Sequence, residues 1–270
     1  MIVRLDGSFQ LLITQPDHAA LAARVMRQWR ADGLPQAPRL SSILLAVEEH
    51  DNGWREVDAA PLVDEATGRV LDFVGAPDQV RRAVWPRGVD RLAATPYAAA
   101  LVAQHALHVY RRYRDDPDWA PFFGDIEARR ERDLQRLPFD SLVRSARSGQ
   151  RHEGGWGPAS MENDRPLAVA DLVREYFFVR IGDLISLTFC NGWTAVQLDD
   201  SGSGYAVRLE GPRLTINPDP FEGREVPLAI TARELPNRPF PSAAEAREAF
   251  SKARHVVVEG VASGAPGTTA

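Results

Sequence analysis

Residues 41–54 read SSILLAVEEHDNGW, and this stretch decides how the rest of the chain is interpreted. Its apolar residues recur at the spacing of a buried helix, and acidic residues, a histidine and an Asn-Gly pair follow them. Because Asn-Gly pairs commonly end helices, the stretch predicts a helix over residues 40–53. His50 and Asp51 then lie side by side at its end, either as solvated charges or as part of a metal site.

The composition is that of an ordinary globular protein. The 270 residues are 44% hydrophobic, which is enough for a large core, and Cys190 in the apolar stretch LISLTFC is predicted to be a buried thiol. The net charge of −5 argues against nucleic-acid binding, which needs a basic surface. We find neither a signal peptide nor an apolar run long enough for a membrane span. We therefore expect a cytoplasmic protein without a nucleic-acid or membrane partner, and an oligomer is possible.

Apolar patterns at helical spacing predict a core of about five main helices between residues 17 and 190. The residues between 55 and 90 are rich in Pro, Gly and Asp and predict irregular connections with short helical pieces. The Gly-rich stretch 148–166, with His152, is expected to be a surface loop, with an active-site lid as the alternative. The predicted main helices cover residues 17–33, 40–53, 95–114, 124–137 and 166–193.

Both ends of the chain predict strands. MIVRL and FQLLI flank Asp-Gly-Ser and predict an N-terminal β-hairpin. After residue 194 the pattern changes to short alternating segments separated by Gly, Pro and Asp, with one helix near residues 241–253. We therefore predict a mainly α protein: a helical domain with its hairpin over 1–192, a small β-rich subdomain over 193–262, and a disordered tail over 263–270.

Several polar residues lie on the predicted apolar helices. A single buried imidazole usually means only a hydrogen-bonded core residue, but an ionised carboxylate on an apolar helix needs a cation or a donor. Histidines and aspartates drawn from different helices suit a transition metal better than calcium. The alternative is a non-catalytic protein whose polar, hydrogen-bonded core binds a ligand or a partner. The residues concerned are His18, His50, Asp51, His105, His108 and Asp183.

The order of these residues resembles the H…HD…H…H…D pattern of the HD-domain superfamily of metal-dependent phosphohydrolases. The chain also resembles a bacterial protein family of unknown function with a QPDHA start, an EHDxGW core and a late D-x-x-S-L helix, here residues 15–19, 48–54 and 183–187. The superfamily resemblance implies an HD-domain-like helical bundle. It also implies one or two divalent ions (Fe, Mn, Ni or Zn) bound by His18, His50, Asp51 and Asp183.

The same resemblance implies a phosphomonoesterase or phosphodiesterase that acts on a small anionic substrate, with Asp51 at the reaction centre. His105 and His108 would form a second metal position or contact the substrate. Arg55 would meet the anion or form a surface salt bridge, and Glu48 and Glu49 would either support the ligands or be solvated. Some relatives of that fold hold two irons and oxidise small organic substrates, so a di-iron oxygenase is the alternative enzyme.

Overall fold

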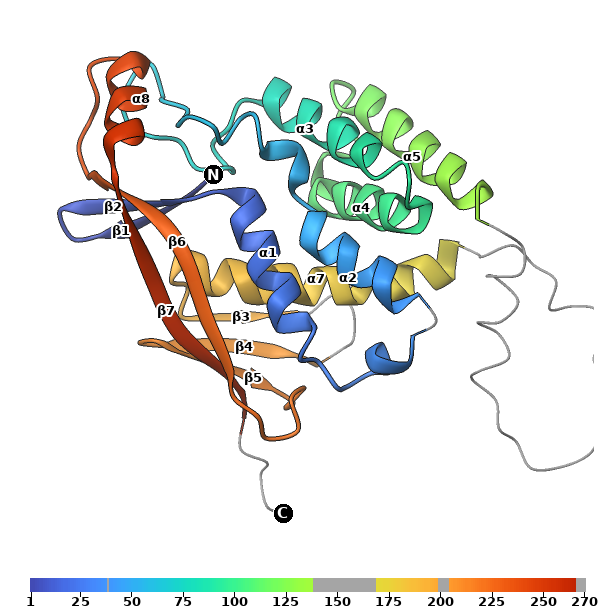
Figure 1. Cartoon of the computed structure of the whole chain (residues 1–270). Coiled ribbons are helices and arrows are strands. Elements are labelled where there is room, and N and C mark those ends of the chain that lie inside the picture. The colour runs from blue at the N-terminus through green and yellow to red at the C-terminus, as the bar shows by residue number, and fades with distance from the viewer. Residues whose placement is uncertain (38, 138–168, 199–203, 266–270) are drawn as a thin grey trace, which may run out of the picture.

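The computed structural model describes residues 1–37, 39–137, 169–198 and 204–265. Most of the helices lie in the first two thirds of the chain (Figure 1). Within the described ranges they are α1 (Gln15–Met26), α2 (Leu40–Glu49), α3 (Asp78–Arg91), α4 (Pro96–Val109), α5 (Ala120–Gln135), α7 (Val169–Asn191) and α8 (Ala243–Lys252), with short 3-10 turns η1 (Leu34–Gln36), η2 (Asn52–Trp54) and η3 (Arg111–Tyr113).

The strands form one curled sheet that resembles half of a barrel (Figure 1). Among the described residues its order is β1-β2-β6-β7-β5-β4-β3, and β5 and β7 form the only parallel pair. The strands are β1 (Ile2–Asp6), β2 (Phe9–Ile13), β3 (Ala195–Gln197), β4 (Ala206–Glu210), β5 (Arg213–Asn217), β6 (Val226–Pro236) and β7 (Arg254–Gly264).

The predicted mainly α fold is wrong, because the chain is mixed α/β with a sheet that draws strands from both ends. The hairpin itself is confirmed, but β2 pairs with β6 in antiparallel register, with Phe9 opposite Pro236 and Leu12 opposite Arg233. An alternating pattern predicts a strand and its buried face, but it does not specify a partner strand at the other end of the chain. The seven-stranded sheet also means that the prediction of an HD-domain-like bundle is wrong.

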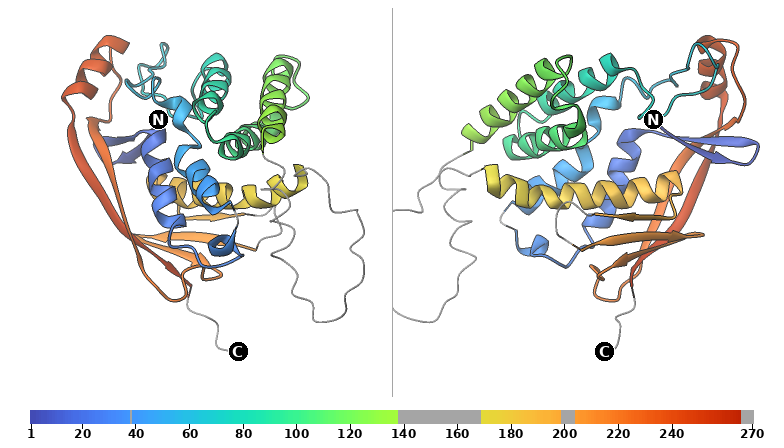
Figure 2. Two further views of the ribbon diagram at one scale, coloured as in Figure 1. Left: turned by 45° about the vertical axis from the view of Figure 1, so that its right-hand side comes forward. Right: turned by 180° about the vertical axis from the view of Figure 1, so that it is seen from behind.

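Helices α1 and α7 lie between the sheet and helices α2 to α5 (Figure 2). Helix α1 packs on β6, and α7 packs on β1, β3 and β4. On their other side, α2 and α4 contact α7, and α3 and α5 pack on α4. One apolar core runs through these layers, from Ile13 and Trp29 to Leu101 and Ile230, and a smaller cluster lies under α8. Helices α1 and α7 are therefore anchored on the sheet.

Most predicted helices are confirmed, and their ends have local causes. Helix α1 begins at Gln15 because the Thr14 side chain accepts a hydrogen bond from the Asp17 amide, which caps the first turn. Helix α2 ends at Glu49, with a 3-10 turn after it, so the helix predicted to reach residue 53 is shorter. Helix α3 occupies part of the stretch predicted to be irregular, since Pro86 and Gly88 inside it obscured the helical pattern.

Other predictions concern single residues and segments. Cys190 is buried, as predicted. The predicted surface loop over residues 148–166, which contains His152, lies outside the described residues. The predicted tail over 263–270 overlaps the end of β7, which runs through Gly264, and its residues from 266 onward also lie outside the described residues. None of the described helices combines the length and the apolar character that a membrane crossing requires.

Candidate metal centre

Four elements converge on one buried group of ligating side chains. His18 lies in the first turn of α1, His50 and Asp51 follow the last turn of α2, and His105 lies on α4. Asp183 lies on α7 directly after Gly182. A Cβ at position 182 would lie 2.9 Å from Met26 Cγ on α1 and 3.1 Å from Val47 Cγ1 on α2, so glycine lets α7 come close to both helices.

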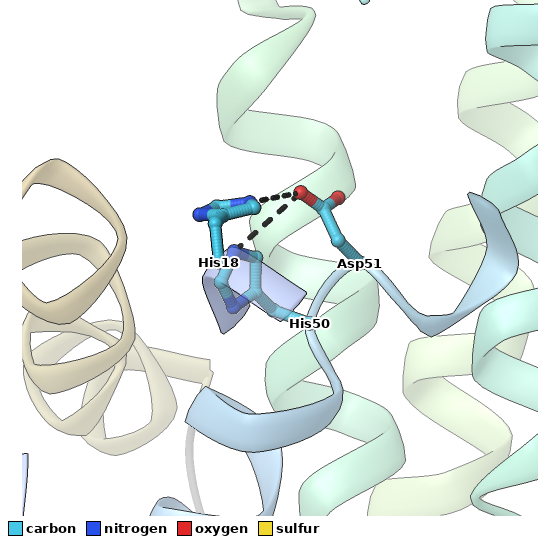
Figure 3. Close-up of side chains that lie close together, drawn as sticks. All are labelled: His18, His50 and Asp51. Atoms are coloured by element: carbon cyan, nitrogen blue, oxygen red, sulfur yellow. Dashed lines mark hydrogen bonds and ion pairs between the residues drawn. The ribbon is translucent and has the colours of Figure 1, made fainter. Parts of the chain in front are cut away.

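Asp51 faces His18 and His50, which precede it in the sequence (Figure 3). Its Oδ2 lies 2.8 Å from His18 Nε2 and 3.6 Å from His50 Nε2. Asp183 Oδ1 lies 3.3 Å from His50 Nε2, and Asp183 Oδ2 lies 3.7 Å from His105 Nε2. Ligands bound to one ion at about 2.1 Å are about 3 to 3.4 Å apart, so these spacings suit a shared cation.

Each of the three imidazoles is held at Nδ1 and turns Nε2 toward the carboxylates. His18 Nδ1 lies 2.9 Å from Ser186 Oγ, His50 Nδ1 lies 2.8 Å from the Val47 carbonyl oxygen, and His105 Nδ1 lies 2.8 Å from the Tyr176 hydroxyl. Metal-ligating histidines are characteristically oriented by such a bond from the other ring nitrogen. All three rings therefore have the orientation expected of ligands.

The hydrogen bonds also assign the protons on two of the rings. A carbonyl oxygen can only accept, so His50 Nδ1 donates to Val47. Ser186 Oγ gives its proton to the Asp183 carbonyl oxygen, so it accepts from His18 Nδ1. In the neutral form of both rings, Nε2 then carries a lone pair that faces a carboxylate oxygen. Lone pairs and carboxylates facing one another need a cation between them, either a proton or a metal ion.

Two buried polar atoms at this place have no hydrogen-bond partner. One is His50 Nε2, whose contacts to Asp51 and Asp183 are ion pairs at 3.6 and 3.3 Å rather than hydrogen bonds. The other is Gln15 Oε1, whereas Gln15 Nε2 donates to Asp51 Oδ2 across 3.1 Å. Such atoms are rare in folded proteins because each costs about 1–3 kcal/mol when it is left without a partner. His50 Nε2 lies among side chains that could hold a metal ion, and Gln15 is hydrogen-bonded to one of them, Asp51.

The charges of the group favour a cation among the carboxylates. Burial would lower the pKa of His50, but Asp51 and Asp183 outweigh this effect and raise it to about 9. Burial would raise the pKa of Asp183, yet His50 holds it below its ordinary value, and His50 does the same for Asp51. Burial lowers the pKa of His105 to about 4, so this ring is neutral near pH 7. The carboxylates therefore stay ionised beside the imidazoles.

Two overlapping sets of donors could hold an ion. His18, His50 and Asp51 form one set, and His50, His105 and Asp183 form the other. Because His50 belongs to both, the arrangement allows one ion with four or more ligands or two neighbouring ions. Nitrogen and carboxylate donors in this mixture suit Zn, Fe, Mn or Ni.

A pocket of about 340 Å³ opens onto this group. His105 and Asp183 form its inner wall, and its other described lining residues come from α4, η3, α7 and the β3 region. They are His108, Val109, Arg111, Tyr176, Arg180, Leu184, Gln197 and Leu198.

Comparison with known proteins gives a family. Residues 1–237 match the family described as "Protein of unknown function (DUF3891)". The chain belongs to this family. No curated protein and no solved structure shows a significant match to it. The predicted membership of a family of unknown function is thereby confirmed, and the link to the HD-domain superfamily stays a prediction.

In this DUF3891 protein, the four residues predicted to bind metal lie together. His18, His50 and Asp51 form one donor set, Asp183 lies beside His50, and His105 joins from α4. His108 is not in either set and lines the pocket instead. Arg55 is exposed, and its Nη2 donates to both carboxylate oxygens of Glu49. Of the two roles predicted for Arg55, contact with an anion or a surface salt bridge, this arrangement corresponds to the salt bridge.

The sequence reasoning assigned no role to three residues that support the cluster, although two of them lie in the quoted QPDHA and D-x-x-S-L motifs. Gln15 precedes His18 by three positions, Ser186 follows Asp183 by three, and Tyr176 precedes Asp183 by seven. These spacings place each residue on the same helix face as the ligand next to it. Helical periodicity counted outward from His18 and Asp183 could therefore have found them.

Proposed function

We propose that this protein is a metal-dependent phosphohydrolase, either a phosphomonoesterase or a phosphodiesterase, that uses one or two divalent transition-metal ions. One observation carries the proposal: in a buried site, oriented imidazoles turn Nε2 toward two ionised carboxylates, and His50 Nε2 lies 3.3 and 3.6 Å from their oxygens without forming a hydrogen bond. A polar core without a metal would be expected to pair these atoms with protein donors.

The proposed role of each side chain follows from its position in the site. His18, His50, Asp51 and Asp183 would hold an ion, and His105 would hold a second ion or contact the substrate, since it lies both beside Asp183 and in the pocket wall. A bound divalent ion supplies a water nucleophile near neutral pH and stabilises negative charge that develops on the substrate. Gln15 and Ser186 keep Asp51 and His18 oriented through their hydrogen bonds.

The choice of hydrolysis rests on resemblance. The ligand order along the chain, His18, then the His50-Asp51 doublet, then Asp183, resembles that of the HD-domain phosphohydrolases. The same donors could hold two irons for oxygen chemistry, so the experiment must separate these two activities.

Metal analysis of the purified protein, prepared without chelators, tests the centre. We expect about one or two equivalents of Fe, Mn, Ni or Zn in the wild type and a loss of most of the metal in His50→Ala. His255→Ala is the matched control, because His255 is exposed on β7. Loss of the ion should also lower the melting temperature of His50→Ala, since a bound ligand stabilises the folded state. A protein free of metal, with His50→Ala as stable as the control, would overturn the proposal.

A substrate panel under Mn, Ni, Fe and Zn tests the reaction. We expect release of phosphate or of an alcohol from phosphate esters, and loss of this activity in Asp183→Asn. The exposed Asp6→Asn serves as the matched control. A centre with two irons that consumes dioxygen and hydrolyses no phosphate ester would replace the hydrolase by an oxygenase.

A further inference from the structure

Among its described lining residues, the pocket beside the candidate metal centre carries more basic than acidic side chains. Two arginines line it, Arg111 from η3 and Arg180 from α7, and among its described lining residues Asp183 is the only acid. Asp183 is also a proposed metal ligand, so its charge would be offset by the ion. Two guanidinium groups therefore line the described part of this pocket, next to the residues that could hold a metal ion.

The position of Arg111 is set by its neighbours on the same chain segment. Its Nη1 lies 3.1 Å from His108 Nε2 and donates to the His108 carbonyl oxygen across 3.0 Å. The His108 ring in turn lies against Tyr176, with ring centroids 5.6 Å apart, and the Tyr176 hydroxyl is hydrogen-bonded to His105 Nδ1. Arg111 is thus connected through His108 and Tyr176 to the wall of the metal centre.

The rest of the lining is apolar or neutral. Val109, Leu184 and Leu198 supply apolar surface, and Gln197 and Tyr176 supply polar groups. The volume of about 340 Å³ is near the lower end of the range for small-molecule sites, which is about 300–1,000 Å³. The pocket therefore suits one anionic group attached to one compact organic group.

We propose that this pocket binds a small phosphomonoester, with Arg111 and Arg180 contacting the phosphate and with Val109, Leu184 and Leu198 against the organic group. This inference rests on the proposed function and narrows it to one substrate class. Guanidinium groups suit phosphate because their planar N–H donors match two phosphate oxygens at once.

Charge and size both favour a monoester over a diester. A phosphomonoester carries about two negative charges near neutral pH, because its second pKa is about 6, whereas a diester carries one. Two arginines beside a metal centre match the larger charge. A diester also has a second organic group, and a pocket of about 340 Å³ leaves little room for it.

Phosphate binding, measured by titration calorimetry on the metal-loaded full-length protein, tests the pocket. Inorganic phosphate is the probe, and the variants are Arg180→Gln and Arg111→Gln. Arg111 is exposed on a short turn, so we expect Arg111→Gln to fold even if Arg180→Gln does not. Arg213→Gln is the matched control, because Arg213 is exposed on β5 and pairs with Glu225. Metal content is measured on every sample.

We expect phosphate to bind the wild type and the control equally, and at least tenfold more weakly to each pocket variant at unchanged metal content. With 4-nitrophenyl phosphate and bis(4-nitrophenyl) phosphate as substrates, we expect preference for the monoester and a raised KM in the pocket variants. Unchanged phosphate binding in both variants, or preference for the diester, overturns the pocket proposal while the metal centre stands. A wild type without metal overturns the proposed function itself, and this inference with it.

Discussion

At the scale of single residues, the candidate centre depends on side chains outside the two donor sets. Ser186 uses its proton on the Asp183 carbonyl oxygen and therefore accepts from His18 Nδ1. This bond selects the tautomer in which His18 Nε2 is free to act as a ligand. A serine one turn after Asp183 thus sets the tautomer of a histidine that lies on another helix.

Replacing Ser186 tests this dependence. Ser186→Ala leaves His18 Nδ1 without its acceptor, so we expect metal affinity to fall about 10- to 100-fold, as is typical when the partner of a metal-bound histidine is removed. The measurement is competition with a chelator of known affinity. Ser251→Ala is the control, because Ser251 makes the same kind of hydroxyl bond, to the Glu248 carbonyl oxygen, on the exposed helix α8. Equal affinities in both variants would contradict the role of Ser186.

The metal-free protein should show a pH dependence that comes from His50. The neighbouring carboxylates raise its pKa to about 9 in the folded protein, above an unfolded value of about 6.5. The protonated ring therefore adds stability that is fully present below about pH 6.5 and is lost as pH rises through about 9, with an upper bound on the order of 3 kcal/mol. We expect denaturant unfolding in a chelator to show this loss.

The contrast between loaded and metal-free protein makes this prediction specific. A bound ion takes the place of the proton on His50, so the loaded protein should lose its stability on acidification, when protons compete with the metal for the imidazoles. A metal-free protein with constant stability between pH 6.5 and 9.5 would show that His50 does not pair with the carboxylates.

At the scale of elements, two glycines set how closely the turn after α2 approaches α3. A Cβ on Gly53 would lie 1.9 Å from the Val84 carbonyl oxygen, and a Cβ on Gly88 would lie 2.9 Å from Asn52 Oδ1. Asn52 Nδ2 also donates to the Gly88 carbonyl oxygen across 3.2 Å. The Asn-Gly pair that follows the doublet therefore serves a close backbone crossing rather than a helix cap, and it fixes Asp51 one residue before.

Gly53→Ala should be strongly destabilising. The added methyl group meets a backbone oxygen that cannot move without displacing α3, so we expect a loss of at least about 3 kcal/mol, at the upper end of overpacking effects. Gly124→Ala is the control, since Gly124 lies inside α5 with no atom within 4 Å of an added Cβ. That control should gain about 0.5–1 kcal/mol from helix propensity. Denaturant unfolding of both variants measures the difference, and two similar changes would contradict the close crossing.

Local patterns in the sequence predict the elements far better than their arrangement. The helix before His50 and the long helix through Asp183 follow from apolar spacing, and the hairpin follows from its turn residues. Helix α3 does not, because Pro86 and Gly88 are usual helix breakers, and Gly88 lies there at the close crossing with the Asn52-Gly53 turn. The polar residues of the candidate centre were singled out because ionisable residues on apolar helices are costly, and the ligand set among them came from the resemblance to the HD-domain superfamily. The pocket arginines, in contrast, look like ordinary surface residues until the fold places them.

At the scale of the whole molecule, the candidate centre depends on a sheet whose described strands contribute no residue to either donor set. His18 and Asp183 lie on α1 and α7, which pack on the curled sheet, and His50 and His105 lie on helices that pack in turn on α7. The sheet itself joins the N-terminal hairpin to β6 near the other end of the chain. Distant strands therefore fix the relative positions of the helices that bring the ligands together.

Ile230 tests this dependence without touching the site. It is buried on β6 in the core that the sheet shares with the helices, so Ile230→Ala should cost about 2–5 kcal/mol. Because one core links the layers, we expect a single unfolding transition in which tryptophan fluorescence, far-UV circular dichroism and metal release shift together to lower temperature. Val257→Ala on the neighbouring strand β7 is the control, since Val257 is exposed and should change stability little. Metal release that keeps its wild-type temperature while the sheet melts earlier would show that the helical part holds the site on its own.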